Sequence, residues 1–132
     1  MSVPSPEELV EARRWLKEAG EELAVATVIG GNPELPGRVA CFHAHLAGEK
    51  ALKALQIRRG VVIRKVHNLV QLAAELPAGD QPRFEGRDLD LLNPWTIDAR
   101  YPADLEDVSQ ETIRQVLAAA GRVLSPVRES VS

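Results

Sequence analysis

The stretch A-C-F-H-A-H-L-A-G-E-K-A-L-K-A-L, residues 40–55, decides how this chain folds. Read as a helix at about 100° per residue, it spreads its alanines, leucines, glycine and cysteine over about half of the circumference. A helix that is apolar and small-sided over so broad a face packs closely against more than one neighbour. We therefore expect residues 40–55 to lie at the centre of a helical bundle.

The flanking residues set the ends of this helix. Pro36 suits the first turn of a helix, where its missing N–H is not needed. Gly60 is a helix stop, because glycine readily adopts the backbone conformation that ends helices. The sequence predicts one helix over residues 36–59.

A second helix is predicted near the N-terminus. Ser5 and Glu8 form the pattern of a capping box, and Pro6 fits the first turn. Residues of the predicted buried stripe recur every three or four positions. They are Leu9, Ala12, Leu16, Ala19, Leu23 and Ala26. We expect the charged residues Glu11, Arg14, Glu18 and Glu22 to face water. The G-G-N-P sequence at residues 30–33 ends the helix.

Shorter elements follow the central helix. Residues 61–63, V-V-I, have no second strand to pair with, so we expect a loop packed on the bundle. Residues 69–76 form a short helix that Pro77 stops. Residues 78–87 are polar and rich in glycine and proline, and we expect a mobile loop. A further short helix is expected over residues 88–92, ended by Asn-Pro.

The last helix is predicted to begin after Ser109, which caps it, and Pro126 is expected to bend or end it. Its apolar stripe again has helical period. The stripe consists of Ile113, Val116, Leu117, Ala120, Val123 and Leu124. The segment 95–102, which precedes this helix, is apolar enough to lie against the core. Together these elements predict an all-α, up-and-down bundle of four to five helices in a single domain, residues 5–128.

Composition narrows the function classes. A chain of 132 residues with a net charge of −3 does not have the basic face that sequence-independent duplex binding needs. Cys41 is the only cysteine, so we expect neither an intrachain disulfide nor a zinc site, and we expect no metal and no cofactor. No segment has a leader pattern or a membrane-spanning run, which predicts a soluble, cytoplasmic protein.

Three ordered segments resemble the HEPN domain family. Residues 40–55 are similar to the family pattern C-F-H-A-Q-Q-A-x-E-K-A-L-K-A, with His45 and Leu46 in place of the two glutamines. His67-Asn68-Leu69 stands where the family has H-D-L, and residues 99–102 read A-R-Y-P, as in the family signature. The resemblance implies a HEPN-like helical bundle that often forms homodimers. It also implies association with a minimal nucleotidyltransferase, sometimes in a toxin-antitoxin pair, with binding of nucleotide or RNA, or metal-independent cleavage of RNA.

Ribonuclease members of the family carry Arg-x(4 to 6)-His, in which histidine moves a proton and arginine stabilises the phosphate. Arg38 precedes His43 by four residues and His45 by six. Arg38 and His45 are nearly aligned on a helix, about 10 Å apart, whereas His43 lies about 140° away from Arg38. The motif is short enough to arise by chance, and in the ribonucleases it lies nearer the C-terminus.

Each histidine also has a structural interpretation. His45 lies one turn before Glu49, a pairing typical of a surface salt link that would also orient the ring. His43 lies between Phe42 and Ala44, which favours a hydrogen-bonded histidine of the core. His67 opens a helix, where it would tie the preceding loop to the bundle.

Further ligand-binding candidates are charged or aromatic residues near these histidines. Glu49, Lys50, Lys53, Arg100 and Tyr101 belong to this group. Arg100 is expected either to pair with Glu49 or to bind a phosphate. The basic residues Lys53, Arg58, Arg59, Arg64 and Lys65 form either a phosphate patch or a solvated helix end.

Three functional hypotheses follow. The first is a noncatalytic HEPN-like protein that binds a nucleotide, nucleic acid or a nucleotidyltransferase partner, as a homodimer joined through small-sided helix faces. The second is a metal-independent ribonuclease toxin that uses Arg38 with His45 or His43. The third is a purely structural interaction module.

Overall fold

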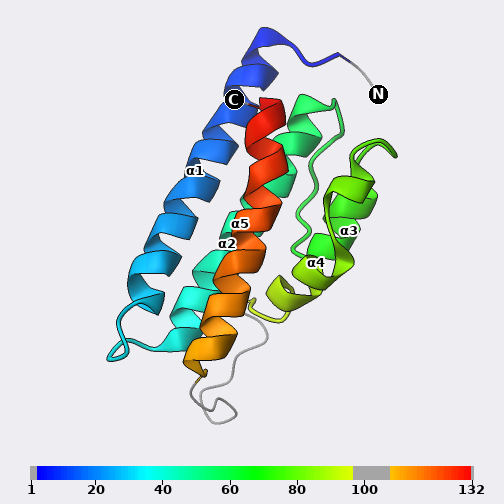
Figure 1. Ribbon diagram of the computed structural model, residues 1–132. Coiled ribbons are helices and arrows are strands. Elements are labelled where there is room, and N and C mark those ends of the chain that lie inside the picture. Colours follow the sequence, from blue (N-terminus) through cyan, green and yellow to red (C-terminus); the bar gives the residue numbers. More distant parts are fainter. Residues whose placement is uncertain (1–2, 97–107, 132) are drawn as a thin grey trace.

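Three long helices lie side by side in the computed structural model, which describes residues 3–96 and 108–131 (Figure 1). Helix α1 (Pro6–Gly30) runs antiparallel to α2 (Gly37–Arg58) and α5 (Gln110–Val131). The chain between α2 and α5 forms α3 (Leu69–Ala74), the 3₁₀ turn η1 (Gln81–Arg83) and α4 (Gly86–Leu92). These short elements cover one side of the long helices. The described residues contain no strand, and the predicted all-α bundle is confirmed.

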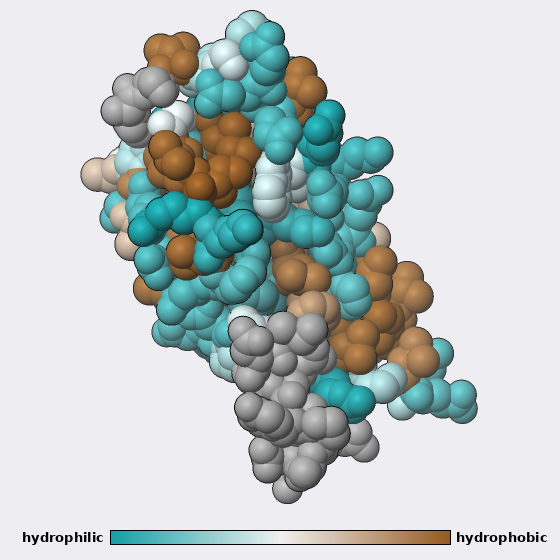
Figure 2. All heavy atoms as spheres, turned by 180° about the vertical axis from the view of Figure 1, so that it is seen from behind, coloured by the Kyte–Doolittle hydropathy of each residue, from teal (hydrophilic) through white to brown (hydrophobic). Residues whose placement is uncertain are grey.

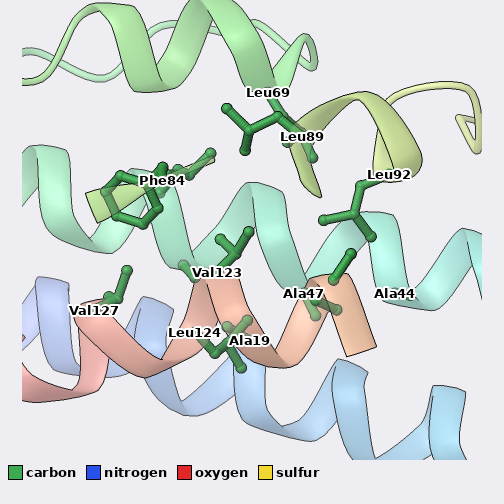
Figure 3. Packing of buried hydrophobic residues seen from close by; sticks show 14 of the residues in the cluster. Ala19, Ala44, Ala47, Leu69, Phe84, Leu89, Leu92, Val123, Leu124 and Val127 are labelled. Carbon is green, nitrogen blue, oxygen red and sulfur yellow. The ribbon is translucent and has the colours of Figure 1, made fainter. Parts of the chain in front are cut away.

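Helix α2 lies at the centre of the bundle, as its composition predicts. It contacts α1, α3, α4 and α5. Ala40, Ala44, Ala47 and Ala51 are fully buried. Alanines of α1 and α2 bring the two backbones close together, and leucines and valines from α3, α4 and α5 fill the space on the other side (Figure 3).

Side-chain caps begin two of the long helices. In α1, Ser5 Oγ accepts from the Glu8 N–H at 3.1 Å, and Glu8 Oε1 accepts from the Ser5 N–H at 3.0 Å, so the capping box is confirmed. Ser109 Oγ accepts from the Thr112 N–H at 3.1 Å at the start of α5. After α2, Gly60 has a φ of 72°, the conformation that made it a predicted stop.

Pro126 does not end the last helix, contrary to that part of the prediction, because α5 continues to Val131. Proline inside a helix costs about 3 kcal/mol. Val123, Leu124, Val127 and Val131 are all buried around it, so packing on both sides of the proline keeps the helix intact.

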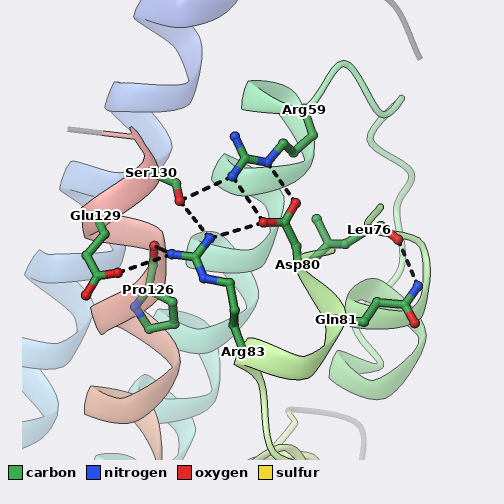
Figure 4. A network of polar contacts seen from close by, with 8 residues as sticks. All are labelled: Arg59, Leu76, Asp80, Gln81, Arg83, Pro126, Glu129 and Ser130. Carbon is green, nitrogen blue, oxygen red and sulfur yellow. Dashed lines mark hydrogen bonds and ion pairs between the residues drawn. The ribbon is translucent and has the colours of Figure 1, made fainter. Parts of the chain in front are cut away.

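The loop over residues 78–87 is folded against the bundle, whereas we expected a mobile segment. The Asp80 carboxylate accepts from Arg59 Nε at 2.7 Å and from Arg83 Nη1 at 3.1 Å. Arg83 also donates to the Pro126 carbonyl at 2.8 Å and to Ser130 Oγ at 2.8 Å (Figure 4). The loop therefore links the end of α2 to the end of α5.

Candidate functional site

Glu49 is the centre of a buried polar cluster on α2. Its side chain is 8% exposed. Glu49 Oε1 accepts from His67 Nδ1 at 2.9 Å, and Oε2 accepts from Lys53 Nζ at 3.0 Å. His45 Nε2 lies 3.4 Å from Oε1. Three basic side chains thus surround one carboxylate, each contributed by α2 or by the loop that follows it.

The charge on Glu49 is stabilised by these neighbours. Burial on its own raises the pKa of Glu49, but the polar contacts with His45, Lys53 and His67 outweigh burial and lower the pKa to about 2. Lys53 also lies over the ring of Trp15 in α1, 5.8 Å from the ring centroid. The carboxylate is therefore ionised at neutral pH and serves as an acceptor only.

His45 is buried in the core and faces α4. It is 1% exposed, and its Nδ1 donates to the Leu92 carbonyl at 2.9 Å. Within the described residues, its Nε2 has only the 3.4 Å contact with Glu49 Oε1, whose geometry is too poor for a regular hydrogen bond. The interpretation of His45 and Glu49 as a surface salt link is wrong, because α3 and α4 cover this part of α2.

His67 is the exposed member of the cluster. Its side chain is 64% exposed, and its Nδ1–H is held by Glu49, so Nε2 is left to face outward. His67 borders a shallow cavity of about 410 Å³ with Asn68, Asn93, Pro94 and Thr96. Among the described residues, a histidine oriented by a buried carboxylate at the edge of this cavity is the arrangement best suited to hold a ligand.

A second cluster joins α2 to α1 around Glu22. His43 Nδ1 lies 2.7 Å from Glu22 Oε1, and Lys50 donates to Glu22 Oε2 at 2.9 Å and to Glu18 at 3.3 Å. Burial on its own raises the pKa of Glu22, but the contacts with Lys50 and His43 lower it by more, so the pKa of Glu22 lies below its usual value. The sequence predicted that Glu22 faces water. In the structure it instead contacts His43 and Lys50, because α2 packs over it.

Arg38 lies apart from both clusters. It belongs to the first turn of α2 and lines a cavity of about 370 Å³ with the turn before α2 and with Val108, Gln110 and Ile113. None of the three histidines lines that cavity. Among the described residues, the structure does not place Arg38 in one site with His43 or His45.

The dense basic run of the sequence is dispersed in the structure. Lys53 pairs with Glu49, Arg59 with Asp80, and Arg64 with Glu75. These pairs bind three of its five cations to acids and favour a structural role for them. Arg100 and Tyr101, the remaining sequence candidates, lie outside the described residues.

Asn68, Asn93 and Thr96 are not among the ligand-binding candidates predicted from the sequence. Asn93 Oδ1 accepts from the Leu69 N–H at 2.8 Å, and its Nδ2 donates to Asn68 Oδ1 at 3.2 Å. The sequence signal was that each asparagine borders a short helix. Asn68 is the N-cap of α3, a position where asparagine is common, and Asn93 is the C-cap of α4. Nothing in the sequence placed the two asparagines side by side.

No helix in residues 3–96 and 108–131 is long and apolar enough to cross a membrane. Within the same residues, no group of three or more His, Cys, Asp or Glu side chains is arranged to hold a metal ion.

The bundle and its histidine-carboxylate clusters define a small helical domain of the kind that the three sequence segments indicated. The HEPN domain model matches residues 12–130, so the chain belongs to the HEPN domain family. The crystal structure of TT1696 from Thermus thermophilus is similar, with 28% sequence identity, a TM-score of 0.74, and coverage of 90% of this chain and 97% of that one.

A second solved structure shares the fold. ST0689, described as an archaeal HEPN homologue, is 21% identical with a TM-score of 0.71, and the match covers 92% of this chain and 98% of that one. Comparison with curated protein sequences gives no significant match.

Proposed function

We propose that this HEPN protein is noncatalytic and acts by binding, holding a nucleotide while associated with a minimal nucleotidyltransferase. The observation that carries the proposal is that each of the three histidines makes a hydrogen bond within the bundle. His43 is bound to Glu22, His67 to Glu49, and His45 to the Leu92 carbonyl. Among the described residues, none of them lines the cavity that Arg38 borders.

The ribonuclease alternative requires a histidine that reaches RNA and an arginine beside it. His45 does not meet the first condition, because it is buried under α4. His43 is accessible in part, but its Nδ1 and its acidic partner are committed to the contact between α1 and α2. The geometry of the described residues therefore supports binding better than cleavage.

RNA cleavage tests the noncatalytic part of the proposal. Purified protein, His43→Ala and His67→Ala are incubated with RNA in the presence of a chelator. We expect no cleavage above a protein-free blank from any of the three. Cleavage that the wild type performs and a histidine variant loses would establish the ribonuclease alternative.

Two further measurements test the binding part. Calorimetric titration with AMP and ATP measures nucleotide affinity, and affinity purification with a minimal nucleotidyltransferase from the same organism tests the partner. We expect binding in both. If neither nucleotide binding nor association with the nucleotidyltransferase is detected, the third hypothesis, a structural module, is left.

A homodimer is part of the same proposal, and the exposed face of α1 suits it. The small-sided face of α2, which we expected to join two copies, is buried within the bundle. On α1, Val10 is 52% and Val28 is 72% exposed. Apolar side chains gather over the C-terminal end of α1 in Figure 2, at the lower right.

The charges on this face are self-complementary. Lys17 and Glu21 lie between the two valines, are exposed, and make no ion pair within the described residues. If two α1 helices pack antiparallel about a two-fold axis level with Ala19, Val10 faces the partner's Val28 and Lys17 faces the partner's Glu21.

Light scattering tests this arrangement. Lys17→Glu and Glu21→Lys should each be monomeric, and mixing the two should restore a dimer. Dimers in all three samples would exclude this interface.

A further inference from the structure

Two of the side chains that line the cavity beside His67, Asn68 and Asn93, use their acceptor oxygens in hydrogen bonds within the protein. Asn68 Oδ1 accepts from the Gln71 N–H at 3.1 Å and from Asn93 Nδ2 at 3.2 Å. Asn93 Oδ1 accepts from the Leu69 N–H at 2.8 Å. The Leu69 and Gln71 N–H groups in the first turn of α3 are bonded to these oxygens, so these two are not available to a ligand.

The donor atoms of the same side chains remain available. Asn68 Nδ2 makes no hydrogen bond within the described residues, and Asn93 Nδ2 uses one of its two hydrogens. Thr96 adds a hydroxyl group to the cavity wall. These groups offer a ligand hydrogen bonds to accept, which favours an oxygen-rich ligand over one that carries donors.

His67 forms the edge of the cavity, and Glu49 fixes the orientation of its ring. Glu49 Oε1 accepts from the Nδ1–H at 2.9 Å, so Nε2 is the ring nitrogen left to face outward. Glu49 is also paired with Lys53 and lies beside His45, so its own charge is balanced by residues beneath the cavity. A bound anion would therefore meet the amide donors of Asn68 and Asn93 beside a carboxylate that is already paired.

We propose that His67, Asn68, Asn93 and Thr96 form a binding site for a phosphoryl group, held by hydrogen bonds that the two asparagine amides and the Thr96 hydroxyl donate. A phosphoryl group offers three terminal oxygens to donors that approach from the loop before α3 and from the segment after α4. A cavity of about 410 Å³ has room for the rest of a mononucleotide. The site rests on the proposed nucleotide-binding function, for which it supplies the location.

Asn68 makes this site particular to the chain. The family pattern that the sequence resembles has aspartate at this position, and a carboxylate caps a helix equally well but only accepts. Asn68→Asp therefore keeps the cap on the Gln71 N–H, removes the outward donor, and adds a negative charge at the cavity. Asn32→Asp is the matched control, because Asn32 Oδ1 also accepts a main-chain N–H, from Glu34 at 3.0 Å, but in the turn between α1 and α2.

Calorimetric titration with inorganic phosphate and with AMP tests the site. We expect Asn68→Asp to weaken binding of both at least about tenfold, the loss of a hydrogen bond to a charged group, and Asn32→Asp to leave it unchanged. His67→Gln, which retains a donor toward Glu49 but removes the imidazole ring from the cavity lining, should weaken both as well. Thermal unfolding of each variant confirms that it is folded.

The outcomes separate the site from the proposed function. If AMP binds wild type and Asn68→Asp with equal affinity, the nucleotide binds elsewhere on the protein. That result would overturn the proposed site but not the proposed nucleotide-binding function. Phosphate that binds in an Asn68-dependent way, without any binding of AMP, would support the site and overturn nucleotide binding. Failure of both ligands to bind wild type would overturn the site.

Discussion

His45 Nδ1 donates a hydrogen bond to the main-chain carbonyl of Leu92, 2.9 Å away, and so joins the middle of α2 to the end of α4. Carbonyl groups at a helix C-terminus have no acceptor role within the helix, so a side-chain donor satisfies one of them. The family pattern has glutamine where this chain has His45. Both side chains carry an N–H donor, which explains why histidine fits in this position.

Loss of this hydrogen bond is expected to destabilise the fold. His45→Ala removes a buried ring and leaves a cavity next to Leu92, and we expect a loss of about 2–4 kcal/mol in the free energy of unfolding. His45→Gln should lose less than about 1 kcal/mol, because the amide donor replaces Nδ1. Urea denaturation measures both. Equal losses in the two variants would contradict a role for the hydrogen bond.

Glu49 should make stability depend on pH in the acid range. Its pKa is lowered from 4.5 to about 2 in the folded protein. The folded state therefore binds a proton less readily than the unfolded chain, and the stabilisation is complete above about pH 4.5 and disappears as the pH falls toward 2. At neutral pH the contribution is on the order of 3 kcal/mol.

The measurement is a series of urea denaturations between pH 2 and pH 7. Glu49→Gln should lose stability at pH 7 and show a shallower fall below pH 4.5 than wild type. Glu34→Gln is the control, since Glu34 is exposed in the turn before α2. An equally steep fall in Glu49→Gln and wild type would show that other carboxylates carry the acid dependence.

Helix ends and core stripes could be predicted from the sequence because they depend on local chemistry. Ser5, Ser109 and Gly60 act on residues within one turn, and the apolar stripes of α1 and α5 need only the helical period. Pro126 shows the limit of local rules. Its effect on α5 was decided by the buried valines around it, which are tertiary contacts.

The candidate site depended on how distant segments meet, and the sequence held only part of that information. It placed His45 and Glu49 one turn apart but did not show that α4 would cover them. His67 reaches Glu49 only because the chain folds back after α2, and Asn93 arrives from the end of α4. Residue type predicted the candidates, whereas partners and burial required the fold.

Glycine positions give a paired test of the packing. A Cβ atom at Gly30 would lie 2.9 Å from Ile113 Cγ2 and 3.0 Å from Leu117 Cδ1, whereas a Cβ atom at Gly121 would meet nothing within 4 Å. We expect Gly30→Ala to cost about 1–3 kcal/mol through overpacking between α1 and α5. Gly121→Ala should stabilise by about 0.5–1 kcal/mol, the gain in helix propensity. Thermal unfolding measures the stability of both variants. If Gly30→Ala is stabilising, Ile113 and Leu117 of α5 can shift to accommodate the added methyl group without strain.

Asp80 is expected to hold the loop between α3 and α4 in place. Its hydrogen bond with Arg59 lowers its pKa most strongly, and Arg83 adds to this effect, so the carboxylate joins two arginines from different segments. Asp80→Ala would remove the carboxylate between the two guanidinium groups and leave Ser130 Oγ as the acceptor that they share. We expect a loss of about 1–3 kcal/mol in the free energy of unfolding.

The same substitution should expose the loop to protease. Trypsin cleaves after arginine, and Arg83 and Arg87 lie in or beside the loop. In Asp80→Ala we expect cleavage after these residues under conditions that leave wild type intact, because the carboxylate that secures Arg83 is gone. Asp90→Ala, at an exposed position of α4, is the matched control and should resist like wild type. Equal resistance of Asp80→Ala would mean that Ser130 and the Pro126 carbonyl suffice to hold Arg83.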